Sequence, residues 1–319
     1  MFLSACQWPK PNDNTAPRDI HTPTYDLLLP TEQDLSRPSG KALLILFPCF
    51  PCDAADTRSE SPIADTAVAN GIAVLMMNFN QHILMSEAEK QEVLDTIAAA
   101  VKAQGVDASN TFIGGFSSGG NVSVLLAKEL VRGPRPGIGL KGVFAVDSPL
   151  DLVLLYECSQ RDLAKSSFPE YKDEARYVLA FLDSTLGSPA DSAPTRAVAE
   201  AGFGGVRPER FGAGALANYE RAAPLLNSSA SVAPLRDLPI RFYTEPDTAW
   251  WRTNRDDRYE QLNAYSMKRI YDTLVAMGNA RAEYITTEGR GVQHGNRHPH
   301  AWSIVDEREL VKWIEGLSQ

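Results

Sequence analysis

The sequence is poor in the residues that cross-link a chain or hold it in a membrane. Its 319 residues include four cysteines, too few for a disulfide scaffold in a chain of this length. Its apolar runs fall well short of the roughly 18 residues that a membrane-spanning helix needs. Basic runs are absent, and the net charge of −9 repels phosphate backbones. We therefore expect no transmembrane segment and no nucleic-acid partner.

The first residues carry a pattern of their own. Residues 3–6, Leu-Ser-Ala-Cys, are similar to the end of a bacterial lipoprotein signal, in which the cysteine is lipidated after cleavage. The charged and apolar regions that come before such a cysteine are missing. The sequence as it stands predicts a cytoplasmic location, whereas a true start upstream of Cys6 would predict a lipid-anchored or periplasmic one.

Short apolar runs recur along the chain, separated by segments with helical periodicity. Runs of this length are typical of parallel strands buried on both faces. We expect strands at Tyr25–Leu29, Ala42–Phe47, Ile72–Met77, Thr111–Phe116, Lys141–Val146, Ile240–Tyr243 and Ala282–Ile285. We expect helices at 86–104, 118–132, 170–186 and 257–277, and a last one from Ser303 or Asp306 onward. The alternation predicts an α/β protein with a doubly wound, mostly parallel sheet.

The alternation is interrupted twice, which suggests a domain organisation. Proline, asparagine, aspartate and threonine are frequent near the start, so we expect residues 1–23 to form an irregular lead-in. Residues 151–235 are rich in alanine, glycine, proline and serine, and we interpret them as an inserted cap. The α/β core then comprises 24–150 and 236–319.

One motif points to chemistry. Residues 115–119 read Gly-Phe-Ser-Ser-Gly, a G-x-S-x-G pattern between an expected buried strand and an expected helix. The turn between them is so tight that glycines two before and two after the serine are needed to make room. We take Ser117 as the nucleophile, because the frame of Ser118 would put Phe116 where a glycine is wanted. The N–H of Ser118 is then an expected oxyanion donor.

A nucleophilic serine needs a base, and the chain has five histidines. Three of them, His294, His298 and His300, fall in one loop between the last expected strand and the last expected helix. We favour His300, which leads directly into that helix, and keep His298 and then His294 as alternatives. A metal site is the other interpretation of this cluster, but no pair with the helical i, i+4 spacing lies inside an expected helix, and we expect no metal and no cofactor.

An orienting acid and a second oxyanion donor are expected at two further strand ends. After Ile240–Tyr243 the chain reads Thr-Glu-Pro-Asp, and we choose Asp247 as the acid, with Glu245 as runner-up. In the loop after Ala42–Phe47, the N–H groups of Cys49 and Phe50 are the candidate donors, since the neighbouring prolines lack one. The C-x-x-C spacing in this loop also permits a redox interpretation, and we interpret it as structural.

Other polar and aromatic residues follow the same strand ends. Trp250 and Trp251 come shortly after the expected acid and are candidates for the pocket wall or for the core. Asp147 and Asp151 follow Lys141–Val146. They are expected either to bind a polar or cationic substrate group or to cap a helix.

These residues together resemble the α/β-hydrolase superfamily over roughly 40–150 and 236–317. Residues 115–120 are similar to the nucleophile turn of its esterase and prolyl-peptidase-like members, and 300–302 resemble its His-x-Trp segment. Residues 244–247 are similar to its G-x-x-D acid segment, with Thr244 in place of glycine. Residues 146–149 and 241–248 resemble a poorly characterised bacterial branch. Pro48 and Cys49 stand where the family usually has His-Gly, so the loop of the second donor departs from the family pattern.

The resemblance implies a serine esterase that cleaves a small-molecule acyl substrate through a Ser-His-Asp catalytic triad and an acyl-enzyme. A peptidase or amidase of the same fold is one alternative. A binding protein that keeps the α/β-hydrolase fold without its chemistry is another. The sequence gives neither the acyl group nor the oligomeric state.

Overall fold

The computed structural model describes residues 16–31, 42–79, 83–165, 168–186, 225 and 229–318. Cys6 and its lipoprotein-like pattern lie outside these residues, as does the part of the expected cap from 187 to 224. Within the described ranges, no helix combines the length and apolar character needed to cross a membrane.

The core is one eight-stranded sheet with the strand order β1-β2-β4-β3-β5-β6-β7-β8. From β4 through β3 to β8 at the far edge, neighbouring strands are parallel. At the other edge, β2 pairs antiparallel with both β1 and β4. The strands are β1 (Arg18–His21), β2 (Tyr25–Leu29), β3 (Ala42–Phe47), β4 (Ala73–Met77), β5 (Asn110–Phe116), β6 (Leu140–Val146), β7 (Ile240–Thr244) and β8 (Ala282–Thr286). The prediction of a doubly wound, mostly parallel sheet is therefore confirmed.

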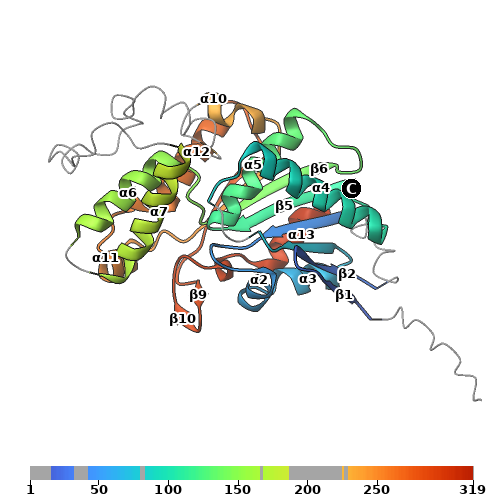
Figure 1. The fold of residues 1–319 in the computed structure, drawn as a ribbon, viewed down its shortest axis with the longest axis horizontal. Coiled ribbons are helices and arrows are strands. Elements are labelled where there is room, and N and C mark those ends of the chain that lie inside the picture. The colour runs from blue at the N-terminus through green and yellow to red at the C-terminus, as the bar shows by residue number, and fades with distance from the viewer. Residues whose placement is uncertain are drawn as a thin grey trace, which may run out of the picture.

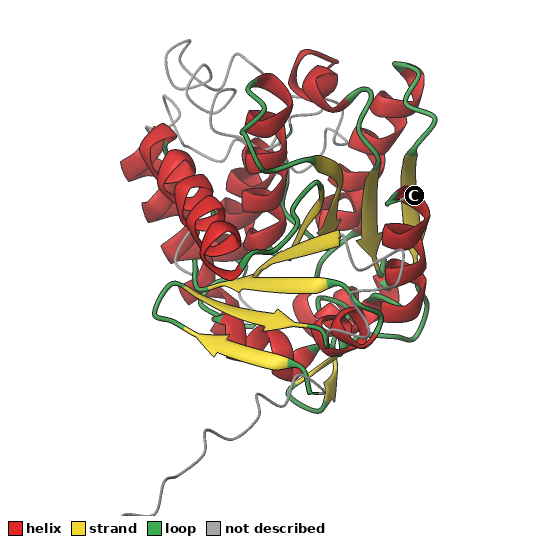
Figure 2. Cartoon of the chain, turned by 90° about the vertical axis from the view of Figure 1, so that its right-hand side faces the viewer, coloured by secondary structure: helices red, strands yellow, loops and turns green. Residues whose placement is uncertain are grey.

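Helices cover both faces of the sheet (Figure 2). Along β3, Leu43 and Ile45 pack in the core beneath α4 and α5, while Leu44 and Leu46 pack toward α2, α3 and α13. A strand buried on both faces needs apolar side chains at successive positions, which is why its sequence is continuously apolar. The covering helices are α2 (Ala54–Glu60), α3 (Ile63–Ala69), α4 (Glu87–Gln104), α5 (Ser118–Arg132), α12 (Asn263–Ala276) and α13 (Glu307–Leu317).

Several of these helices begin or end at the capping residues that the sequence predicts. Ser86 and Glu89 form a capping box at the start of α4, and Gly105 ends it with a left-handed φ of 65°. The helix α5 begins at Ser118, directly after the serine of the motif. Asp306 caps α13 through its side chain, which accepts a hydrogen bond from the Glu309 N–H.

Two expected boundaries are wrong. Residues Arg18–His21, expected in an irregular lead-in, form the exposed edge strand β1. The helix expected at 257–277 begins only at Asn263, because Asp257 is held in ion pairs with Lys165 and Arg255 rather than in a helical turn. A separate helix, α11 (Thr248–Arg255), precedes it.

The chain between β6 and β7 adds a helical layer beside the sheet. Two helices, α6 (Leu152–Ala164) and α7 (Glu170–Leu186), pack against each other, and a hydrogen bond joins Tyr156 to Asp183. They lie near α11 at the left of Figure 1. Arg255 of α11 reaches both helices, because it pairs with Asp162 and Glu174. A short helix, α10 (Ser229–Val232), then leads back toward β7.

Candidate active site

Ser117 lies on the sharp turn between β5 and α5. Its φ of 53° and ψ of −124° are unusual for a residue with a side chain. A Cβ atom on Gly115 would lie 2.3 Å from the carbonyl of Gly119, so the turn closes only with glycine at these positions. The turn therefore holds Ser117 in a strained backbone conformation of the kind found at functional sites.

The imidazole of His300 lies against the carboxylate of Asp147. Nδ1 of His300 is 2.5 Å from Oδ2 of Asp147, and the Asp147 side chain is almost completely buried. In the sheet register Phe116 pairs with Val146, so Ser117 and Asp147 occupy matching positions at the ends of adjacent strands. The Ser117 N–H donates to the carbonyl oxygen of Val146, 2.9 Å away.

Asp147 is itself held from two sides. Its φ of 39° is again in the left-handed region, which a non-glycine residue rarely adopts. Its N–H donates to the carbonyl oxygen of Tyr243 at 2.8 Å, and its carbonyl oxygen accepts from the side-chain amide of Asn263 at 2.8 Å. These two bonds tie the residue to β7 and α12 and fix its carboxylate toward the histidine.

Ser117 and His300 line one cavity of about 120 Å³. Its walls come largely from α6, α7 and α11, and they include Leu155, Val178 and Trp251. The imidazole of His300 also packs on the Phe116 ring, with 4.5 Å between ring centroids. Ser117 and His300 thus share one pocket at the carboxyl ends of the parallel strands, where α/β sheets bind ligands, and Asp147 contacts the histidine.

Comparison with known proteins places this geometry on a familiar fold. No protein-family profile and no curated protein sequence matches the chain. A mutant of the rice cell wall degrading esterase LipA from Xanthomonas oryzae superposes with a TM-score of 0.57 at 12% identity, over 92% of this chain and 85% of that one. The inhibited esterase B from Lactobacillus rhamnosis gives 0.53 at 14% identity, over 92% and 82%. Carboxyl esterase 2 from Tuber melanosporum gives 0.51 at 12% identity, over 98% and 87%.

The protein has the α/β-hydrolase fold. On this fold the chain order Ser117, Asp147, His300 follows the usual order of nucleophile, acid and base. At these low sequence identities the similarity shows the fold alone, and evidence for the chemistry comes from the residues around the pocket.

The acid expected from the sequence occupies another position in this α/β-hydrolase fold. Asp247 caps α11, since its Oδ1 accepts from the Trp250 N–H at 2.9 Å, and its Oδ2 accepts from Arg297 at 3.0 Å. Glu245, the runner-up, also bonds to Arg297. The expectation that either orients the histidine is corrected, because Asp147 contacts the imidazole. Asp147 was expected to bind a substrate group or to cap a helix, and its place at a strand end beside Ser117 is the signal that could have identified it as the acid.

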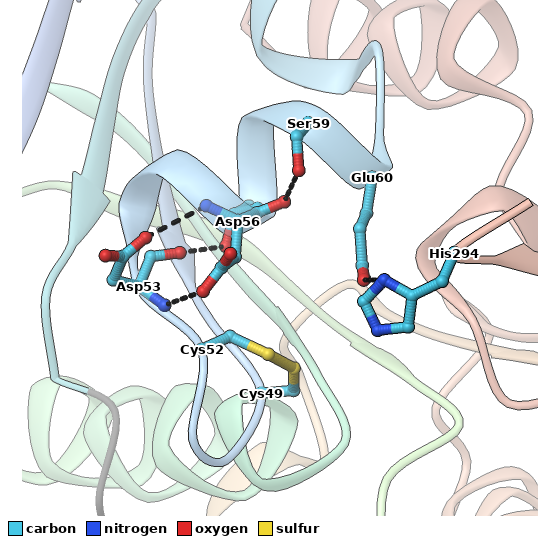
Figure 3. Close-up of a disulfide and its surroundings, with 8 residues drawn as sticks. Cys49, Cys52, Asp53, Asp56, Ser59, Glu60 and His294 are labelled. Carbon is cyan, nitrogen blue, oxygen red and sulfur yellow. Dashed lines mark hydrogen bonds and ion pairs between the residues drawn. A yellow bond between two sulfur atoms is a disulfide. The ribbon is translucent and has the colours of Figure 1, made fainter.

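The other two histidines of the loop lie away from the acid. Nδ1 of His298 is 2.9 Å from the carbonyl oxygen of His300, and its ring packs against Trp250 and Trp251. Burial lowers the pKa of His298 to about 4, so this imidazole is neutral at pH 7. His294 is exposed beside Glu60, to which its ring nitrogen lies within 3.8 Å (Figure 3).

The loop after β3 is pressed against the start of α5. A Cβ atom on Gly119 would lie 2.3 Å from the carbonyl oxygen of Phe47 and 2.4 Å from that of Pro48. The loop that carries the expected oxyanion donors Cys49 and Phe50 therefore starts in close contact with the helix that begins directly after Ser117.

A disulfide between Cys49 and Cys52 closes this loop (Figure 3). The Cys52 N–H also donates to the Cys49 carbonyl oxygen, and Asp53 then caps α2. The ring of Phe50 stacks on Tyr177 of α7, with 4.6 Å between centroids. The loop is thus fixed by the disulfide within itself and by an aromatic contact to the inserted helices.

Metal-binding side chains were the alternative interpretation of the histidine loop. Among the residues that the structure describes, no three His, Cys, Asp or Glu side chains are grouped so as to hold a metal ion. His300 is engaged by Asp147, and His298 is packed between two tryptophans. Hydrogen bonding and packing therefore account for both of these histidines.

The half-buried His298, whose imidazole is neutral at pH 7, predicts a pH dependence of stability. Below pH 6.5 the unfolded chain binds a proton at His298 that the folded protein takes up only near pH 4, so folding stability falls as the pH is lowered through this interval. His298→Gln removes this contribution, and we expect it to lose less stability than the wild type between pH 7 and pH 4. Urea unfolding at several pH values measures the difference. Equal losses in both proteins would contradict the half-buried neutral imidazole.

Proposed function

We propose that the protein is a serine hydrolase that cleaves carboxylic esters, with Ser117 as nucleophile, His300 as general base and Asp147 as orienting acid. The observation that carries the proposal is the hydrogen bond between His300 and Asp147 in the pocket that Ser117 also lines. Three independent features agree with it: the left-handed turn at Ser117, the buried carboxylate, and the chain order of the three residues.

In the first half of the reaction, Nε2 of His300 takes the proton of the Ser117 hydroxyl. The Ser117 oxygen attacks the ester carbonyl and forms a tetrahedral intermediate. His300 then returns the proton to the leaving alcohol as the carbon–oxygen bond breaks, which leaves the acyl group on Ser117. Asp147 accepts the Nδ1–H throughout, so it keeps the imidazole in the productive tautomer and stabilises its cation.

In the second half, water replaces the alcohol. His300 removes a proton from the water, whose oxygen attacks the acyl-enzyme, and the protonated imidazole then returns the proton to the Ser117 oxygen. The products are a carboxylic acid and the free serine. Neither step needs a metal or a cofactor, because the developing charges lie on oxygen atoms and on the imidazole.

The negative oxygen of the intermediate needs hydrogen-bond donors. The N–H of Ser118 is the first donor in this proposal, because it belongs to the residue after the nucleophile and opens α5, whose amino end favours negative charge. The loop of Cys49 and Phe50 is the source of the second. Its place against Gly119 supports this role, although proline precedes the donors where the family usually has His-Gly.

The nucleophile is tested with a fluorophosphonate probe and with p-nitrophenyl acetate. We expect the wild type to take up one phosphonyl group on Ser117 and to hydrolyse the ester. Ser117→Ala should take up no label and lose at least about 10³-fold in kcat. Ser118→Ala is the matched control, because only its backbone N–H is assigned a role. A folded protein that hydrolyses neither this ester nor its homologues, and stays unlabelled, would favour the non-catalytic alternative.

The acid is tested by two matched substitutions on neighbouring strand ends. Asp147→Asn should lower kcat by about 10³- to 10⁴-fold, because an amide cannot hold the imidazole in the required tautomer. Asp247→Asn should change kcat by less than about tenfold, because its amide oxygen can still accept from Arg297 and it does not touch His300. Steady-state kinetics on p-nitrophenyl acetate measures both. The reverse ranking would return the acid role to Asp247.

A further inference from the structure

The histidine loop has little structure of its own to hold His300 in place. It contains a hairpin of two strands with two residues each, β9 (Val292–Gln293) and β10 (Asn296–Arg297). The His298 N–H donates to the Gly291 carbonyl oxygen at the base of the hairpin, at 3.0 Å. An isolated two-stranded hairpin is at best marginally stable in water, so contacts with the rest of the protein must fix the orientation of the β9–β10 hairpin.

Arg297 at the end of β10 supplies such a contact. Its Nη2 donates to Oε1 of Glu245 and, at 3.0 Å, to Oδ2 of Asp247. Both carboxylates follow β7, the strand next to the one that carries Asp147. One guanidinium nitrogen thus bridges two acids at the end of the sheet, three residues before His300.

Burial makes this contact obligatory. The Glu245 side chain is 0% exposed, and a carboxylate in that setting stays charged only if it is paired. The second oxygen of Glu245 accepts a hydrogen bond from the Thr287 hydroxyl at 2.8 Å. Among the described residues, Arg297 is the only cation that pairs with Glu245. The bridging nitrogen belongs to a rigid, planar guanidinium, whereas a lysine ammonium would sit on a flexible stem.

The same end of β7 holds the next part of the loop. The helix α11 begins directly after Asp247, and its Trp250 and Trp251 pack against the His298 ring. Arg297 and His298 are therefore both seated on one segment, and His300 follows them toward Asp147. The two acids after β7 anchor the loop, while the acid after β6 contacts the imidazole.

We propose that Arg297 is a positioning residue, which anchors the histidine loop on Glu245 and Asp247 so that His300 reaches Ser117 and Asp147 together. This inference rests on the proposed function. Its rival is that Arg297 only neutralises the buried Glu245 and so supports folding without affecting the chemistry. The two differ in what happens when both charges are removed together.

The experiment compares four variants in the full chain. Arg297→Gln removes the anchor, and Arg297→Lys keeps a positive charge without the rigid guanidinium. The double variant Glu245→Gln/Arg297→Gln removes the anchor and the buried charge together. Arg290→Gln is the control, because Arg290 lies in the same loop with a half-exposed side chain 3.7 Å from Asp306. Melting temperature, kcat and KM on p-nitrophenyl acetate are measured for each.

We expect Arg297→Gln to lower kcat by about 10- to 100-fold with KM changed less than about threefold, because misplacement near 1 Å costs rate of that order. Arg297→Lys should be intermediate, and Arg290→Gln unchanged. The double variant should fold and remain slow. A double variant with the kcat of the wild type would overturn the proposal and leave Arg297 as a charge partner alone. If neither glutamine variant folds, wild-type kcat in Arg297→Lys overturns it instead.

Failure of the positioning role is distinguishable from failure of the proposed function. If Ser117→Ala abolishes hydrolysis and labelling while the Arg297 variants behave as the wild type, only the positioning inference is wrong. If Ser117→Ala keeps the wild-type rate, the proposed function itself is wrong, whatever the Arg297 variants do.

Discussion

The hydrogen bond between His300 and Asp147 joins two parts of the chain that are 153 residues apart, and the geometry of the pocket depends on it. Parallel pairing of β5 with β6 places Ser117 and Asp147 at matching positions, each just beyond the end of its strand. Both residues have left-handed φ angles, which turn the chain sharply as it leaves the sheet. The sheet thus provides the serine and the acid, and the loop after β8 needs only to bring the imidazole to them.

Carboxylates follow two adjacent strands, β6 and β7, and either strand end could in principle contact the histidine. Which carboxylate contacts His300 depends on which of them are already paired with a cation. Asp147 has no cation on its carboxylate among the described ion pairs, and its backbone is held by Tyr243 and Asn263. Glu245 and Asp247 are instead occupied by Arg297. In our proposal, the strand end that most resembles the family's acid segment anchors the loop, and the neighbouring strand end carries the acid that orients the base.

Much of the fold and half of the site follow from local rules in the sequence. The turn at Ser117 is predictable because it needs glycines at positions 115 and 119, where a Cβ atom would clash, and these lie within five residues of each other. The ends of α4 are predictable from the capping residues Ser86, Glu89 and Gly105. Buried parallel strands are recognisable because a short strand needs apolar side chains at successive positions only where both of its faces are covered. The candidate bases could be limited to one loop, because three of the five histidines lie between the last strand and the last helix.

What the sequence could not supply depends on contacts between distant residues. Asp147 and Asp247 both follow strands, and only the three-dimensional position of Arg297 separates their roles. The start of α12 was misplaced because Asp257 pairs with Lys165, which follows α6 and lies 92 residues away in the sequence. The packing of the disulfide loop on Gly119 likewise joins segments about 70 residues apart, through backbone atoms that no side-chain pattern reports.

The most direct test of the account is a crystal structure of the protein after reaction with a small alkyl fluorophosphonate, whose adduct resembles the tetrahedral intermediate. The account predicts phosphorus on the Ser117 oxygen, the phosphoryl oxygen within hydrogen-bond distance of the Ser118 N–H and of an N–H from residues 49–50, and His300 held between the adduct and Asp147. An adduct on another residue, or an imidazole that is bonded to Asp247 while Asp147 lies free, would contradict it.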